Sequence, residues 1–288
     1  MIDIQKLTPK DFPPCLREIP QAPKYLYARG KIPNWDEHIF LSVVGSRKFS
    51  AYGRSACAEL IAGLAGYPIV IVSGLAIGID SIAHESALKA GLLTLAVPGS
   101  GLNPAVLYPS QNRRLAEKIL EADGALLSES EPDERATVWS FPRRNRIMAG
   151  LSQAVLLIEA TEKSGTLITA RLALDYNRDV LVVPGSIFSP SSIGTNKLIT
   201  QGATPVLDSA DILRALHLEV EDDKKQESLF ADLSPEEKKI VEILQTEPLP
   251  RDELLRVAKF SASTGNSLLM VLEIKGVIKE IGGEICLC

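Results

Sequence analysis

The feature that most constrains the fold is a regular alternation of short apolar runs and amphipathic segments between residues 39 and 218. The apolar runs are rich in Val, Ile and Leu, which is typical of strands that are buried on both faces of a sheet. We predict strands at 39–44, 69–73, 92–97, 125–128, 154–159, 179–183 and 204–207. We predict helices at 51–65, 80–90, 111–122, 143–151, 166–177, 194–201 and 209–216. Strands separated by helices indicate an α/β domain with a parallel sheet that carries helices on both faces.

The two ends of the chain differ in composition from this middle part. Residues 1–38 contain six prolines and are too few for a core of their own, so we expect a lead-in segment that packs on residues 39–218. Residues 219–232 are charged and without apolar periodicity, which is typical of a linker. In residues 233–288 we expect three helices and a hairpin, the order of a small winged-helix domain. These elements are predicted at 235–246, 250–257, 262–275, 277–280 and 284–287.

The formal net charge of −5 hides an uneven distribution of charged residues. Residues 40–218 hold sixteen Lys/Arg and sixteen Asp/Glu, whereas residues 219–288 hold nine and fifteen. Residues 135–158 contain four arginines and no carboxylate. Because phosphate binding requires a local basic patch and not a basic protein, the net charge does not exclude nucleic acid.

Several protein classes are disfavoured by simple absences in the sequence. The N-terminus carries Asp3 and no apolar region of a signal peptide, and no apolar run approaches the ~18 residues of a membrane-spanning helix. The four cysteines are scattered without a CxxC pair, so we interpret them as reduced thiols and not as a zinc site or disulfide framework. We therefore expect a cytoplasmic protein with no membrane contact and no metal.

The turn after the first predicted strand, Gly45-Ser46-Arg47, has the features of an anion site. A glycine lets an oxyanion approach the backbone, and Ser50 is placed to cap a helix whose N-terminal N–H groups favour negative charge. Arg47 adds a cation that can grip phosphate in two places. From this stretch alone, an ordinary tight turn with a surface arginine is an equally good interpretation.

The second strand is followed by a similar turn, Ser73-Gly74 to Gly78-Ile79, before a predicted helix. Two such strand ends side by side would give adjacent anion-binding loops at the carboxyl edge of the sheet. Asp80 and His84 are four residues apart on one helix face and could form an acid–base pair. We favour the alternative, that Asp80 caps the helix and His84 packs below it, because capping aspartates are common.

The segment FPRRNRIMAG at 141–150 carries the clearest signal for nucleic acid. Arginines crowd a helix start beside Phe141 and Asn145, with no compensating carboxylate nearby. A base can stack on the phenylalanine while arginines hold phosphates, which is how single strands are bound without sequence readout. An ordinary solvated helix face is the alternative interpretation.

Two further strand ends are followed by residues that can bind phosphate. One is Lys163 with Ser164-Gly165-Thr166; the other, with a weaker signal, is Gly194 to Lys197. Each alone could be an ordinary capped helix. The chain contains neither GxxxxGK[ST] nor GxGxxG at its first turn, which argues against a P-loop ATPase and a dinucleotide dehydrogenase.

Together these motifs resemble the DprA/Smf family. The resemblance rests on GSR at 45–47, SGLAIGID at 73–80, the PGSG and YP pair within 98–109, FPRRNRIMAGLS at 141–152, SGTLITA at 164–170 and GTNKLITQGA at 194–203. It implies an extended Rossmann-like sheet, often with a C-terminal winged helix. It also implies a homodimer that binds single-stranded DNA, protects it and loads the RecA recombinase during natural transformation. No catalytic activity and no cofactor are implied.

The resemblance also implies the residues that would contact DNA. They are Gly45, Ser46, Arg47, Ser73, Gly74, Gly78, Ile79, Phe141, Arg143, Asn145, Arg146, Lys163, Ser164, Gly165, Thr166 and, at the rim, Lys197. We expect Arg47 and Arg146 to lie near one another and to hold successive phosphates.

Two other functions remain possible at this point. One is a Rossmann-like nucleotide or phosphoribosyl hydrolase that uses Asp80 or Glu159 as its base; the other is a protein-interaction module with a basic patch. The predicted recognition helix at 262–275 has a single cation, Lys275, with Glu273 beside it. We therefore expect the winged helix to have a docking or regulatory role and not to bind DNA.

Overall fold

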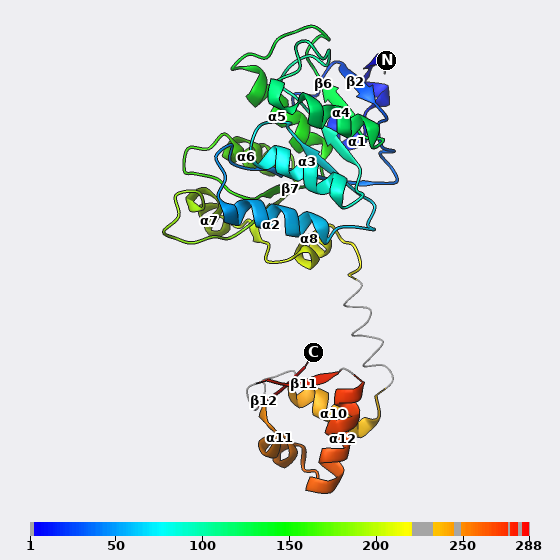
Figure 1. The fold of residues 1–288 in the computed structure, drawn as a ribbon, viewed down its shortest axis with the longest axis vertical. Coiled ribbons are helices and arrows are strands. Elements are labelled where there is room, and N and C mark those ends of the chain that lie inside the picture. The colour runs from blue at the N-terminus through cyan, green and yellow to red at the C-terminus, as the bar shows by residue number, and fades with distance from the viewer. Residues whose placement is uncertain (1–2, 221–232, 245–248, 276, 282–283, 288) are drawn as a thin grey trace. The chain divides into compact units, whose positions relative to one another are not determined.

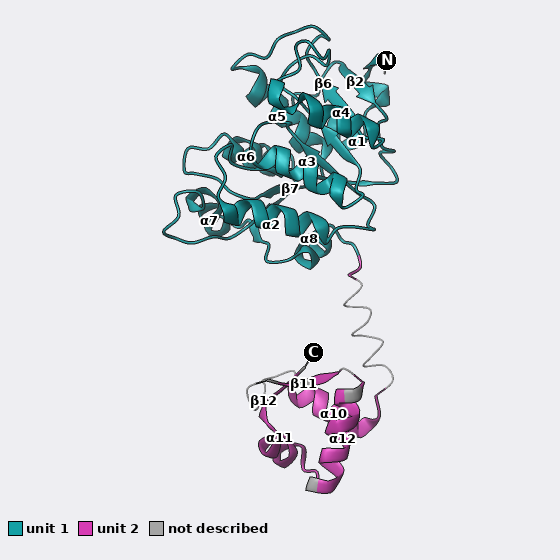
Figure 2. Cartoon of the chain, in the orientation of Figure 1, with its two compact units in different colours: residues 1–218 teal, residues 219–288 magenta. Residues whose placement is uncertain are grey.

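The computed structural model describes residues 3–220, 233–244, 249–275, 277–281 and 284–287. The chain divides into two compact units, residues 1–218 and residues 219–288 (Figures 1 and 2). Most of the segment predicted as a linker, residues 221–232, lies outside the described residues.

The first unit is built on a nine-stranded sheet with the strand order β1-β2-β6-β5-β4-β3-β7-β8-β9. Strands β3 to β9 pair in parallel, which confirms the predicted parallel sheet for this part of the chain. The strands are β1 Ile4–Leu7, β2 Leu26–Gly30, β3 Ile39–Val44, β4 Ile69–Ser73, β5 Thr94–Ala96, β6 Ala125–Ser128, β7 Ala154–Leu157, β8 Asp179–Val182 and β9 Thr204–Pro205.

Helices cover both faces of this sheet (Figure 1). Buried residues of α5 and α6 share one core with alternate side chains of the central strands, among them Phe40 and Val44. On the other face α4 packs against β5 and β6, and α3 contacts both α2 and α4. The α-helices of this unit are α1 Pro14–Arg17, α2 Ala51–Ala62, α3 Ile79–Lys89, α4 Arg113–Glu121, α5 Ser140–Leu151, α6 Thr166–Asp175, α7 Ile193–Thr200 and α8 Ser209–Ala215.

Helix α5 begins at Ser140, three residues before the predicted start at 143. Pro142 therefore lies in the first turn of the helix, where its missing N–H has no partner to lose. This earlier start places Phe141 inside the helix, in a fixed relation to the residues that follow it.

Two strands of the lead-in segment, β1 and β2, belong to the sheet, which was not predicted from the sequence. Strand β2 pairs antiparallel with β6, and β1 pairs antiparallel with β2. The side chains of Leu16, Ile19, Leu26 and Ala28 are buried in the main core of the unit. The lead-in segment therefore protects an edge of the sheet, which is otherwise parallel.

Arg146 ties this segment to α5. It donates hydrogen bonds to the carbonyl of Gln21 and to the Glu129 carboxylate, with an Nη2–Oε2 distance of 2.5 Å, and its side chain is only 8 % exposed. Arg143 reaches the same carboxylate with its Nε, at 2.9 Å, but its side chain is 64 % exposed. The structure thus corrects the prediction that Arg146 grips phosphate beside Arg47, because its guanidinium is committed inside the protein.

The described residues of the second unit form three helices and a three-stranded sheet of order β10-β12-β11, which confirms the predicted winged-helix domain. Its core gathers Ile240, Leu254, Leu272 and Ile285. The elements are α10 Pro235–Leu244, β10 Leu249–Pro250, α11 Arg251–Ala258, α12 Ala262–Ile274, β11 Ile278–Ile281 and β12 Glu284–Leu287. Among the described residues of both units, no helix combines the length and the apolar character needed to cross a bilayer.

The two arginines on Glu129 give a test of this arrangement. Arg146→Met leaves a largely buried carboxylate with one partner fewer, so we expect it to lower the free energy of unfolding by about 3 kcal/mol. Arg143→Met removes an exposed ion pair from the same carboxylate and should cost under about 1 kcal/mol. Urea denaturation measures both, and equal effects of the two substitutions would contradict the structural role of Arg146.

Candidate nucleic-acid interface

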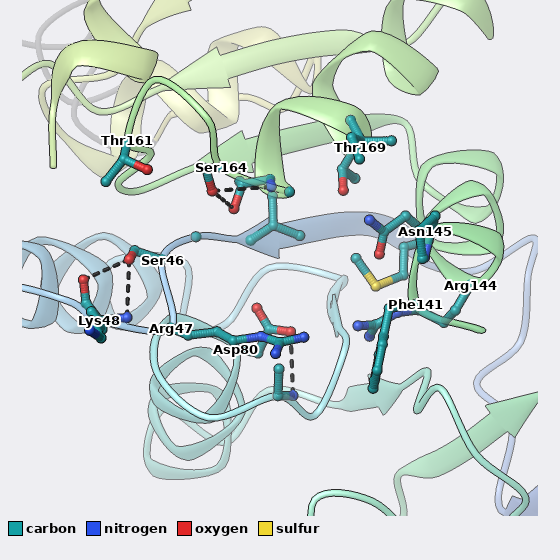
Figure 3. A pocket seen from close by; sticks show the side chains of 18 residues that line it. Ser46, Arg47, Lys48, Asp80, Phe141, Arg144, Asn145, Thr161, Ser164 and Thr169 are labelled. Atoms are coloured by element: carbon teal, nitrogen blue, oxygen red, sulfur yellow. Dashed lines mark hydrogen bonds between the residues drawn. The ribbon is translucent and has the colours of Figure 1, made fainter. Parts of the chain in front are cut away.

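A cavity of about 510 Å³ opens at the carboxyl ends of β3 and β7 (Figure 3). Its volume is within the range of small-ligand pockets. Four segments line it: the turn after β3, the residues Ala76 and Asp80 around the start of α3, the first turns of α5, and the loop and first turn of α6. The predicted site residues that line it are Gly45, Ser46, Arg47, Phe141, Asn145, Ser164, Gly165 and Thr166.

Arg47 and Phe141 meet across this cavity although they are far apart in the sequence. The guanidinium carbon of Arg47 lies 5.2 Å from the centroid of the Phe141 ring, within the range of a cation–π contact. Tyr108 lies on a neighbouring loop, and the centroid of its ring is 5.7 Å from the centroid of the Phe141 ring. Arg47 and Tyr108 are both exposed, so this group offers a flat aromatic surface and a cation to solvent.

The turn that carries Arg47 is held by its own side chains and by the next loop. Ser46 Oγ donates to the Lys48 carbonyl at 2.6 Å and accepts from the Lys48 N–H at 3.1 Å. Gly78 packs on this turn with φ +96°, and a Cβ there would lie 2.5 Å from the Ser46 carbonyl oxygen. The turn is therefore preformed.

Three predicted contact residues support the cavity but do not line it. Ser73 is fully buried and donates to the Val43 carbonyl at 2.7 Å, Ile79 packs beneath Gly45, and Gly78 supports the Arg47 turn as described. We correct their predicted role from direct contact to positioning.

The predicted residue Gly74 has a different reason to be glycine. The Arg144 guanidinium occupies the space where a Cβ of Gly74 would stand, and its Nη1 donates to the Val97 carbonyl at 2.6 Å. Gly74 also lines a small hollow next to the cavity, together with Arg47, Tyr108 and Phe141. A glycine at this position thus allows α5 to approach the ends of β4 and β5.

Arg144 and Asp80 line the cavity, although neither was among the predicted contact residues. Asp80 is nearly buried and accepts a hydrogen bond from the Ala76 N–H at 3.4 Å. Burial raises the pKa of its carboxyl group, while the positive charge of Arg144 acts in the opposite direction. Helical spacing from Phe141 to Arg144 and Asn145 is the sequence signal that could have identified Arg144.

Lys48, Thr161 and Thr169 also line the cavity without having been predicted. Lys48 follows Arg47 directly, and the two threonines add hydroxyl groups on the β7 side (Figure 3). By contrast, Lys163 and Lys197 are exposed and do not line it, so their role as rim cations stays a prediction. Arg143 lines a neighbouring hollow and not the cavity.

The N-terminus of α6 opens into the cavity. Gly165 precedes the helix, and Ser164 Oγ accepts a hydrogen bond from the Thr166 N–H at 3.2 Å. The N–H groups of the first turn donate to Ser164 and Gly165, so this helix start offers an anion its positive dipole and the hydroxyl groups of Ser164 and Thr166. Ser164, Gly165 and Thr166 therefore form a second polar wall, opposite Phe141.

The N-terminus of α2 is not available for an anion, which corrects the first interpretation of the Gly45–Ser50 stretch. Glu159 accepts from the Ser50 N–H at 2.9 Å, from its hydroxyl at 2.6 Å and from the Ser191 hydroxyl at 2.8 Å. Ser50 does cap the helix as predicted, because its Oγ accepts from the Gly53 N–H. The chain thus supplies its own carboxylate at this helix start.

The three groups suggested for acid–base chemistry, Asp80, His84 and Glu159, do not come together at the cavity. His84 is fully buried, bonds to the Thr94 hydroxyl through Nδ1 at 2.7 Å and does not line the cavity. Burial lowers its pKa to about 3, so it stays neutral at physiological pH. Glu159 is committed to the start of α2, which leaves Asp80 as the one suggested base at the cavity. Among the described residues, no three metal-ligating side chains gather in one place.

Comparison with known proteins gives consistent matches over both units. The family described as DNA recombination-mediator protein A matches residues 4–217, and the DprA winged helix domain matches residues 224–284. The chain is 43% identical to Protein Smf of Escherichia coli over 206 residues, 71% of this chain and 54% of that protein. It is 44% identical to DNA processing protein DprA of Streptococcus pneumoniae over 204 residues, 70% of each. The matched region thus spans about half the length of the E. coli relative.

Solved structures agree with these relationships. The X-ray structure of DprA from S. pneumoniae aligns with a TM-score of 0.69 at 39% identity over 75% of both chains. A structure that describes the single-stranded DNA binding mode of DNA processing protein A from Helicobacter pylori aligns with a TM-score of 0.67 at 31% identity. That alignment covers 75% of this chain and 96% of the other. The chain therefore belongs to the DNA recombination-mediator protein A family, also called DprA/Smf.

Proposed function

We propose that this chain binds single-stranded DNA in the cavity between β3, α5 and α6, and acts by holding a strand and handing it over. The observation that carries the proposal is the Arg47–Phe141 pair, which joins a cation and an aromatic face at the cavity. Aromatic stacking combined with basic side chains is the usual way to bind single strands without base preference. The single-stranded DNA binding described for the H. pylori relative supports the same substrate class.

Different walls of the cavity contact the base and the phosphates of a bound nucleotide. A base stacks on Phe141, while Arg47 and Lys48 neutralise the phosphates on either side of it. The start of α6 faces a further phosphate oxygen with the positive end of the helix dipole and with the hydroxyl groups of Ser164 and Thr166. Phosphate contacts of this kind fix the strand without reading its sequence.

The shape of the site favours a single strand over a duplex. Phe141 and Asn145 point into a concave space of about 510 Å³, where an unstacked nucleotide fits and a base pair within a duplex does not. The first turns of α5 form part of the cavity wall. This helix therefore does not project from the surface in the way a helix that enters the major groove of duplex DNA does.

The wider role follows the family. We propose that the protein acts in the cytoplasm as a homodimer, protects incoming single strands and transfers them to a RecA-type recombinase during natural transformation. Membership of the recombination-mediator family is what supports these partners.

A hydrolase that uses Asp80 is the rival function. Its support is that Asp80 borders the cavity and that burial raises the pKa of its carboxyl group, in the direction that a general base at neutral pH requires. Against it, Asp80 bonds to the backbone of its own loop and has no histidine or glutamate partner among the described cavity residues. We therefore propose binding without catalysis.

We propose that the winged helix does not carry the affinity for DNA. Three of its cations are paired with carboxylates: Arg251 with Glu280, Arg256 with Glu253, and Lys275 with Glu237. Lys239 lies over the Phe260 ring at 5.3 Å. Because these cations are already engaged, they offer little to a phosphate backbone.

Competition between single-stranded and duplex oligonucleotides tests the substrate. We expect the full chain to prefer single strands strongly, with little preference among bases. The logarithm of the binding constant should fall with the logarithm of the salt concentration at a slope of about −3, for ~4 neutralised phosphates. Fluorescence anisotropy measures both, and equal affinity for duplex or salt-independent binding would contradict the proposal.

Reversal of charge at Arg47 tests the cavity. Arg47→Glu removes a charge-assisted grip and adds repulsion, so we expect binding of oligo(dT) to weaken by about 2–4 kcal/mol. Arg114→Glu is the matched control, since Arg114 is exposed on α4, which packs on the opposite face of the sheet from α5. Neither change should alter the melting temperature by much, and equal binding by both variants would exclude Arg47 from the site.

Removal of the winged helix tests whether the first unit alone carries the affinity for DNA. A chain that ends at Leu218 keeps every described residue of the cavity and should bind short single strands with nearly full affinity. A tenfold loss, about 1.4 kcal/mol, in a truncated chain that is folded and still dimeric would assign DNA binding to the winged helix.

A further inference from the structure

Trp139 is the most unusual exposed residue near the cavity. It directly precedes α5 and is 81 % exposed, although tryptophan is normally largely buried. Val138 beside it is 75 % exposed. Trp139 does not line the cavity, so the proposed function leaves it unexplained.

The backbone around Trp139 is fixed. Ser140 Oγ donates to the Gly99 carbonyl at 2.5 Å and accepts from the Thr137 N–H at 3.1 Å. These bonds hold the residues on either side of Trp139 against the loop after β5. The exposed indole is thus presented by an anchored turn.

The start of α5 has two aromatic faces. Phe141 and Asn145 line the cavity, whereas Trp139 and Arg143 line a neighbouring hollow of about 90 Å³. Residues four apart lie on the same side of a helix, so each aromatic ring has a polar partner one turn further along. Arg144 lines both spaces and forms the wall between them.

We infer that Trp139 is a second stacking platform, which takes the base of a nucleotide just outside the cavity. The inference rests on the proposed function, because the strand must first be held at Phe141. A strand that leaves the cavity past Arg144 passes over the start of α5 and meets the indole face. Every base has a π face, so this contact extends the binding site without adding sequence preference.

The charges of the hollow favour a base over a phosphate. Glu129 and Glu134 both line it, but Glu129 is paired with Arg143 and Arg146; the exposed carboxylate of Glu134 is the one that repels a phosphate and can accept hydrogen bonds from a base amino group. Arg143 remains 64 % exposed at its edge, where it can follow the backbone. The indole face, the Glu134 carboxylate and the Arg143 guanidinium thus match a base, the polar edge of that base and its phosphate.

Tryptophan fluorescence gives a direct test, because the chain contains two tryptophans. Trp35 packs on Phe40 and donates its Nε1–H to the Asp11 carbonyl at 3.1 Å, away from the cavity. In a full-length W35F chain, Trp139 is the remaining reporter. Titration with oligo(dT) should quench its emission, with the same midpoint as the anisotropy of labelled DNA. If W35F does not fold, the wild-type signal minus that of W139F replaces it.

Oligonucleotide length separates the two platforms. We expect W139A to weaken binding of oligo(dT) of about 20 nucleotides fivefold or more, and W139F to restore most of it. A short oligonucleotide that fills only the cavity should bind W139A and wild type alike, whereas F141A should weaken both lengths. Phe188→Ala is the matched control, because Phe188 is 88 % exposed in the loop between β8 and α7 and lines neither space.

The failures are distinguishable. If wild type binds DNA but the Trp139 emission is unchanged and W139A binds like wild type, the inference is overturned and the proposed function stands. An emission change that depends on protein concentration and not on DNA would also overturn it, in favour of contact between copies of the chain. If wild type binds no single-stranded DNA, the proposed function and the inference fall together.

Discussion

The site depends on one buried contact, the hydrogen bond from Arg144 to the carbonyl of Val97. This bond crosses over Gly74 and joins the first turns of α5 to the ends of β4 and β5. Because α5 is fixed there, Phe141 and Asn145 point into the cavity from one side of the helix and Trp139 projects from the other. A side chain at position 74 would displace the guanidinium, and the helix start would lose its register with the sheet.

A second constraint, the position of the Glu159 carboxylate, determines which helix start is open to the cavity. Two helices, α2 and α6, begin at the same edge of the sheet, one after β3 and one after β7. Glu159 closes the start of α2 with an internal carboxylate, whereas the start of α6 opens into the cavity at Gly165. The internal anion also links β7 to α2 and to the loop at Ser191. Because the Glu159 carboxylate already occupies the start of α2, only the start of α6, of these two, is open to the cavity.

Much of this arrangement was predictable because parallel strands place their carboxyl ends along one edge. That rule brought Arg47 and Ser164 together, whereas Phe141 was assigned to the same site from its arginine-rich helix start and from the family resemblance. The strands and helices of residues 39–218 were predicted to within a few residues, since their apolar runs are long and regular. Strands β1 and β2 were missed because they are short and lie among prolines and charged residues.

The errors at the site have a common cause, which is that partners distant in the sequence are invisible to local patterns. Arg146 was predicted to face DNA because residues 135–158 hold no carboxylate. Its guanidinium instead forms an ion pair with Glu129 and donates a hydrogen bond to the Gln21 carbonyl. Arg144 was left out of the predicted contacts, although it shares the helical face of Phe141. A count of charges found the basic helix start correctly, but only three-dimensional contacts separate its structural arginines from those that remain exposed.

The central claim is that the cavity at the start of α5, and not the winged helix, holds the strand. Ultraviolet cross-linking of the full-length chain to oligo(dT), mapped by mass spectrometry, tests it most directly. The account predicts cross-links at Phe141 and in the turn that carries Arg47, which are lost under competition by unlabelled single strands but not by duplex. Cross-links confined to residues 233–288, with none on the residues that line the cavity, would contradict it.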